Sequence, residues 1–156
     1  MKNTIKVLLF SLMTVFVSSC DDDTVDLPDN YVAFKTAEVG LTGADATLEL
    51  TLTRAADAAI PVTVTLTPTG VEYGKHFTTE PAATGNVISL TIPQGQSSAS
   101  IKVTPVAGIL LSGSETLNFS ISQVTAPTLI GLTKDTKLSF SKIISQGSQL
   151  TLEGKT

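Results

Sequence analysis

Hydrophobic and polar residues alternate along most of the chain after residue 30. In the segment 46–54, Leu48, Leu50 and Leu52 lie on one side, with glutamate and threonine on the other. The same alternation recurs in the segments 31–36, 61–68, 87–93, 98–106, 116–122 and 136–143. A period of two is typical of strands with one buried and one wet face, as in antiparallel sheets. The pattern therefore predicts an all-β fold, an antiparallel two-sheet sandwich of about seven strands.

Turn-forming residues separate these segments, and no window has a sustained helical period. We predict turns at Gly40 and Gly43, 55–60, Gly70 and Gly74, 94–95, Gly108 and Gly113, and Pro127 and Gly131. Six apolar residues at the centres of alternating segments are predicted to lie in the core: Leu50, Val64, Leu90, Ile101, Phe119 and Phe140. Thr51 follows Leu50 directly, so we expect its side chain on the wet face.

The first residues of the chain have the layout of a secretory signal. Lys2 and Lys6 precede an apolar run from Val7 to Val17, and small serines follow this run. A membrane-spanning helix needs about 20 apolar residues, and this run is shorter. We therefore predict a signal peptide at residues 1–19.

Cys20 is the only cysteine of the chain and follows the sequence VSS directly. The stretch VSSC resembles the lipobox of bacterial lipoproteins, in which the cysteine thiol is lipidated. We predict a covalent lipid on Cys20 as the membrane anchor, and no other cofactor. Two or more acyl chains anchor a protein stably, because each methylene buried in the membrane contributes about 0.8 kcal/mol to binding. The alternative is ordinary cleavage after Ser19, which would leave a free thiol.

Acidic residues follow the cysteine in a segment, 20–30, that we interpret as a tether. Asp21, Asp22 and Asp23 resemble the export signal of Bacteroidetes lipoproteins, which implies an outer-membrane protein facing the cell exterior. The tripeptide DTV is similar to the short O-glycosylation motif of the same lineage, which implies a glycan on Thr24. The alternative is a plain solvated linker, as charge runs usually are.

Composition limits the remaining function classes. The formal net charge is −4, and the chain has one arginine, Arg54, and no basic cluster. Phosphate backbones are bound by clustered lysine and arginine, so we predict no nucleic-acid partner. A single cysteine forms no internal disulfide, so burial must stabilise the fold. The mature length suits one domain, predicted at residues 31–144, with a fraying tail at 145–156.

Two stretches, 74–106 and 110–122, resemble the Calx-beta domain. A Pro-x-Gly turn falls at Pro93, and the Glu-x-x-x-Phe strand runs from Glu115 to Phe119. The resemblance implies a Calx-beta, immunoglobulin-like sandwich over nearly the whole folded part. It also implies calcium binding, for which the family gathers several carboxylates at one end of the sandwich.

This sequence departs from the calcium-binding pattern. The loop 107–114 contains no acid, and His76 and Phe77 replace the family's corner aspartate and tyrosine. Calcium takes six to eight oxygen ligands, several of them charged. We therefore predict no metal site. A calcium site would require Glu115 to converge with distant acids such as Glu38 and Glu72.

His76 is the only histidine of the chain and therefore its only candidate for a histidine general base. A serine hydrolase would need an orienting acid such as Glu72 or Glu80, and no Gly-x-Ser-x-Gly turn occurs. A single histidine also forms no multi-histidine zinc site. We predict no catalytic residue and interpret His76 as a polar corner residue. A carboxylate pair for glycoside hydrolysis stays open, because any two acids could meet in space.

These observations predict a lipid-anchored cell-surface module that is not an enzyme and binds or adheres to an extracellular ligand or partner protein. The alternative is a structural or assembly subunit of an outer-membrane complex that works by edge-strand pairing. A calcium-binding module is the third reading. The chain has no tryptophan, which disfavours a sugar-stacking site. Exposed aromatic residues clustered at one end would favour the first reading, and a long unpaired edge strand the second.

Overall fold

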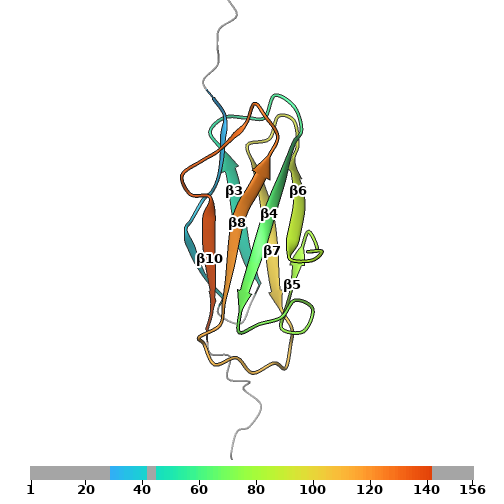
Figure 1. Cartoon of the computed structure of the whole chain (residues 1–156), viewed down its shortest axis with the longest axis vertical. Coiled ribbons are helices and arrows are strands. Elements are labelled where there is room, and N and C mark those ends of the chain that lie inside the picture. The colour runs from blue at the N-terminus through green and yellow to red at the C-terminus, as the bar shows by residue number, and fades with distance from the viewer. Residues whose placement is uncertain (1–28, 42–44, 142–156) are drawn as a thin grey trace, which may run out of the picture.

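The protein is a sandwich of two five-stranded sheets, and the computed structural model is seen with one sheet in front of the other (Figure 1). The structure describes residues 29–41 and 45–141. The predicted signal peptide, Cys20, the three aspartates, Thr24 and the tail at 145–156 lie outside the described residues. Among the residues described, no helix has the length and hydropathy needed to cross a bilayer.

Each sheet combines strands from the whole described range. The strands are β1 (Tyr31–Phe34), β2 (Glu38–Leu41), β3 (Ala46–Leu52), β4 (Ile60–Thr69), β5 (Phe77–Glu80), β6 (Val87–Ile92), β7 (Ser98–Pro105), β8 (Thr116–Val124), β9 (Leu129–Ile130) and β10 (Asp135–Phe140). One sheet has the order β5-β7-β3-β1-β9, and the other has the order β2-β10-β8-β4-β6. The predicted all-β sandwich is therefore confirmed.

All seven alternating segments form strands, and three further strands are short. β2, β5 and β9 have between two and four residues, too few for an alternating pattern to be read. The turn predicted at Gly40 is wrong, because Gly40 lies within β2 and pairs with Ser139 of β10, whereas Gly43 lies outside the described residues. The hairpin at Gly85 and Asn86, both with positive φ, was not predicted.

The sheets are mixed rather than wholly antiparallel. Most neighbouring strands run antiparallel, but β1 pairs with β9 in parallel, and β2 pairs with β10 in parallel. The chain leaves one sheet after Phe34 and enters the other at Glu38. Because the intervening residues are too few to reverse the chain, β2 keeps the direction of β1 and lies alongside β10.

The core lies between the two sheets and contains all six predicted residues. Their exposed fractions are between 0 and 7%: Leu50, Val64, Leu90, Ile101, Phe119 and Phe140. Thr51 faces away from the core and is half-buried. Burying one such side chain contributes roughly 1.5–3 kcal/mol. This core fixes the strands whose ends carry the loops.

Candidate functional site

The loops gather at two ends of the sandwich, which differ in their side chains. We call the end formed by Asn30 and the loops 53–59 and 125–134 the N-terminal end; it is at the top of Figure 1. We call the end formed by the loops 70–76 and 106–115 the far end; it is at the bottom. The N-terminal end contains a cavity and a neighbouring groove.

Asn30 ties three segments together at the N-terminal end and is only 5% exposed. Its side-chain amide donates to the carbonyl of Arg54 at 3.2 Å, and its side-chain oxygen accepts from the Thr53 hydroxyl at 2.9 Å. The backbone carbonyl of Asn30 accepts from the N–H of Leu129 at 2.9 Å. These bonds fix the start of β1 against the ends of β3 and β9.

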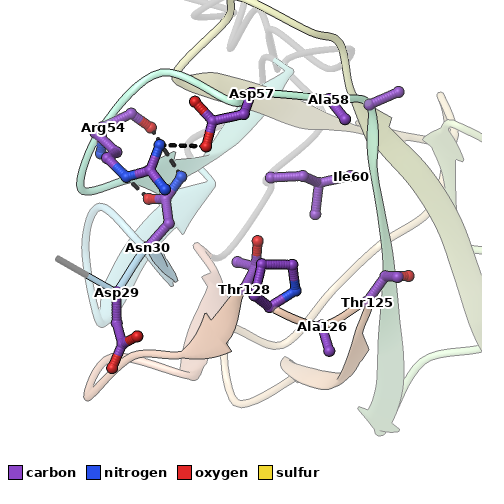
Figure 2. A pocket seen from close by; sticks show the side chains of 11 residues that line it. Asp29, Asn30, Arg54, Asp57, Ala58, Ile60, Thr125, Ala126 and Thr128 are labelled. Atoms are coloured by element: carbon purple, nitrogen blue, oxygen red, sulfur yellow. Dashed lines mark hydrogen bonds and ion pairs between the residues drawn. The ribbon is translucent and has the colours of Figure 1, made fainter. Parts of the chain in front are cut away.

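A cavity of about 390 Å³ opens between the start of β1, the β3–β4 loop and residues 125–128 (Figure 2). Ile60 lines its apolar side, and Thr128 is buried in its wall. Arg54 forms an ion pair with Asp57 across its rim, and the Asp29 carboxylate points away from the other labelled side chains. The guanidinium is thus already engaged within the protein, and the cavity offers a ligand small apolar walls and hydroxyl groups.

The groove beside this cavity has a volume of about 560 Å³ and no charged lining residue. It lies over the outer face of β1 and β3, under the segment that follows β9. Its lining residues are Tyr31, Ala33, Thr51, Leu52, Thr53, Ile130, Gly131, Leu132 and Thr133. Three of the five large apolar side chains that are exposed among the described residues line it: Tyr31, Ile130 and Leu132, the last fully exposed. A fourth, Leu129, lies next to the groove, because it pairs with Tyr31 in the β1–β9 register. The N-terminal end therefore presents an apolar surface.

Local structure explains why these apolar side chains face solvent. Tyr31 and Ala33 alternate with buried Val32, so they lie on the outer face of β1. The N–H of Gly131 donates to the carbonyl of Val32 at 2.8 Å, which holds the segment after β9 against β1. A Cβ at position 131 would lie 3.2 Å from the Ala33 Cβ, so glycine permits this close approach. Leu132 follows directly and is fully exposed to solvent.

The sequence did not point to this groove. Leu129, Ile130 and Leu132 lie in a segment for which only turns at Pro127 and Gly131 were predicted. The available signal was three large apolar residues within a short loop, where polar residues are the rule. That these residues are exposed rather than buried depends on the pairing of β9 with β1, which spans about a hundred residues of chain.

At the far end, the loop 106–115 is closed by Glu115. The Glu115 carboxylate accepts from the Ser112 backbone N–H at 3.0 Å, from the Ser112 hydroxyl at 2.8 Å and from the Gly113 N–H at 2.8 Å. The hydrogen bonds from Ser112, and then that from Gly113, lower the pKa of Glu115 to about 2. Gly70, with φ of 74°, brings the neighbouring loop close to the Glu115 side chain. Glu115 therefore acts as a loop-closing group.

The acids considered for calcium have separate partners. Glu38 pairs with Lys137 at 3.0 Å, and Glu72 pairs with Lys75 at 3.4 Å. Within the ranges 29–41 and 45–141, no three His, Cys, Asp or Glu side chains come together as a metal site. Glu115 uses its own oxygens for the loop. The absence of a metal site remains a prediction, which the melting temperature in calcium against a chelator tests.

His76 closes the turn between β4 and β5. The His76 Nδ1 accepts from the backbone N–H of Glu72 at 2.9 Å, and the backbone N–H of His76 donates to the Glu72 carbonyl at 3.0 Å. Glu80 lies at the end of β5, opposite Lys102 of β7. His76 thus bonds to the backbone of Glu72, and not to the carboxylates that a catalytic histidine would need for orientation.

No family model and no curated protein matches this chain. Among solved structures, the chain is similar to the apo form of the Calx CBD1 domain, with a TM-score of 0.60 and 8% identity over 74% of this chain and 99% of that domain. It is also similar to CBD12 of CALX1.2 and to the calcium binding domain CBD12 of CALX1.1. Each of these has a TM-score of 0.58 and 8% identity, and the match covers 71% of this chain and under half of the other. The likeness establishes a Calx-beta-like fold and nothing about ligands.

Proposed function

We propose that this protein is a lipid-anchored module on the outer face of the outer membrane, that it is not an enzyme, and that it binds a partner protein through the groove at its N-terminal end. The observation that carries the proposal is the cluster of Tyr31, Leu129, Ile130 and Leu132 around an uncharged groove. Large exposed apolar side chains gathered in one place are typical of protein interaction sites. Each of them would be removed from water when the groove is covered.

The chemistry of the groove favours a protein over a glycan. Sugar-binding sites present aromatic rings on which a sugar face can stack, and this groove has one aromatic residue, Tyr31. Aliphatic side chains and threonines make up most of its remaining lining. Such a surface suits an apolar side chain of a partner protein, surrounded by polar contacts at the rim.

The predicted anchor places constraints on the partner. Ten residues, 21–30, separate Cys20 from the start of β1. This segment can span at most about 35 Å. The N-terminal end would therefore stay near the membrane surface. We propose that the partner is another protein held at that surface.

Site-specific photo-crosslinking in intact cells tests the binding surface. A photo-reactive amino acid replaces Leu132 in the groove, and in a matched chain it replaces Leu110, which is 72% exposed at the far end. We expect a discrete protein adduct from position 132, lost when Ile130→Asp is added, and none from position 110. Adducts to lipid alone, or equal adducts from both positions, would contradict the proposal.

Detergent-phase partitioning tests the anchor independently of the groove. The full-length chain should enter the detergent phase, and the Cys20→Ala chain should stay in the aqueous phase. Protease treatment of intact cells should digest the anchored chain. Protection until the outer membrane is broken would show that the protein faces inward and that Asp21, Asp22 and Asp23 do not direct surface export.

A further inference from the structure

Among the described strands, β6 forms one edge of its sheet, and no described strand pairs with its outer side. Its one described partner is β4, in the register Val62↔Leu90 and Val64↔Ile88. The N–H of Leu66 donates to the carbonyl of Asn86, so the even-numbered residues of β6 are those whose backbone groups face β4. The N–H and C=O groups of Ser89 and Thr91 therefore point away from the sheet. Val87 also points outward, but it is bonded to Thr84 within the hairpin.

The other three edge strands are shorter or carry charge. β9 has two residues, and the four-residue β2 carries Glu38, paired with Lys137. β5 has four residues and includes Glu80. Short length and charged side chains are the usual means of preventing edge-to-edge association. β6 has six residues and no charge, and the stretch from 81 to 101 contains no charged residue at all.

We infer that β6 is a self-association site at which two copies of this chain pair antiparallel around a two-fold axis at Leu90. Ser89 of each copy then lies opposite Thr91 of the other, and each such pair exchanges two backbone hydrogen bonds. The side chains suit this register, because Ser89 and Thr91 are both exposed on the outer face and Leu90 meets its own copy on the inner face. No like charges come together in this pairing, since residues 81–101, which include β6, carry no charge.

The pairing would join two five-stranded sheets into one continuous sheet. β6 and β9 lie at opposite margins of the sandwich, because β6 contacts β7 across the core whereas β9 borders β1. Each copy therefore keeps its groove uncovered, and the dimer presents two of them. The inference does not depend on a ligand for the groove. Tethered copies on a membrane would associate more readily than free ones, since tethering raises their effective concentration.

Disulfide trapping tests the register. All chains carry Cys20→Ala, which removes the native thiol. One chain carries Ser89→Cys and the other carries Thr91→Cys. Residues of a hydrogen-bonded antiparallel pair have Cα atoms about 5.5 Å apart, which suits a disulfide. The mixture should form the disulfide-linked heterodimer rapidly, and Ser89→Cys alone should form the linked homodimer at least about tenfold more slowly, because those positions are diagonal.

Sedimentation of the Cys20→Ala chain tests the association itself. Ser89→Pro removes one outward N–H from each copy without touching the bonds to β4, so the dimer dissociation constant should rise about thirtyfold. Thr91→Lys should also weaken the dimer by tenfold or more. The matched control is Thr78→Lys, an exposed threonine on the edge strand β5, which should leave the dissociation constant unchanged. Circular dichroism of each variant verifies that it remains folded.

Several outcomes would overturn the inference. One is a monomeric Cys20→Ala chain up to several hundred micromolar. Another is a dimer that tolerates both Ser89→Pro and Thr91→Lys, or one that forms disulfides equally well from either combination of cysteines. A monomer in which the Thr91→Cys thiol resists alkylation would show that a different segment of the chain covers this edge, and it too would rule out self-pairing there.

Discussion

At the N-terminal end, four large apolar side chains stand in solvent around an uncharged groove. At the far end, the acid of the loop 106–115 folds back onto the loop's own backbone, and Leu110 is the one large apolar side chain exposed there among the described residues. Both ends are attached to the same core. The far end uses its acid to close its own loop, whereas the N-terminal end exposes apolar surface among the described residues.

The Calx-beta likeness covers the framework that the two ends share, but not the difference between them. In the sequence, the resemblance draws attention to the far-end loop and to Glu115. The structure gives that loop a closed hydrogen-bonding pattern and places the apolar surface at the opposite end. A fold shared at 8% identity therefore transfers the framework and not the site.

The largest expected loss of stability comes from a substitution in the core that both ends share. Phe119 is fully buried, and Phe119→Ala should lower the free energy of unfolding by about 3–5 kcal/mol through lost burial and a cavity. Thr51→Ala, on the outer face, should change it by less than about 0.5 kcal/mol. Urea unfolding of the Cys20→Ala chain measures both. Equal losses would mean that the assignment of inner and outer faces is wrong.

A smaller loss of stability is expected from a substitution at the N-terminal end. Asn30→Ala should lower the free energy of unfolding by about 1–3 kcal/mol, because it leaves the Thr53 and Arg54 groups without their buried partner. The control is Asn118→Ala on the exposed face of β8, which should be near neutral. An unchanged midpoint for Asn30→Ala would show that the N-terminal end is held by other contacts.

At the far end, we expect a small and pH-dependent effect from Glu115→Gln. The pKa of Glu115 is about 2 in the folded chain, below its ordinary value of 4.5. The carboxylate therefore stabilises the fold fully above pH 4.5, and this contribution is lost as the pH falls towards 2. The urea midpoint of Glu115→Gln should lie below that of the unsubstituted chain at pH 7, and the gap should narrow over this range. A gap that stays constant down to pH 2 would contradict the assigned role.

The smallest expected effect is the response to calcium. Millimolar calcium should leave the melting temperature unchanged relative to a chelator, because Glu115 is engaged by its loop and Glu38 and Glu72 each pair with a lysine. A bound ion would add about 2.7 kcal/mol at a hundredfold excess over its dissociation constant. A rise of several degrees that Glu115→Gln abolishes would show that the far end rearranges to bind the ion.

Local alternation determined much of this protein. Segments such as 46–54 and 116–122 specify both a strand and its buried face, because a period of two needs no information from elsewhere in the chain. The six predicted core residues are all buried for this reason. The sequence also contains the predicted lipidation site at Cys20, which lies outside the described residues.

Tertiary structure alone decided the features that come from pairing distant segments. β2 and β9 are too short to show a pattern, and each exists because a neighbour, β10 or β1, supplies its hydrogen bonds. The groove follows from the second of these pairings, since that pairing brings Gly131 and Leu132 beside Tyr31. Likewise, β6 is an edge only because no other described strand pairs with its outer side. Each of these features depends on which strands become neighbours, and alternation within one strand does not encode its neighbours.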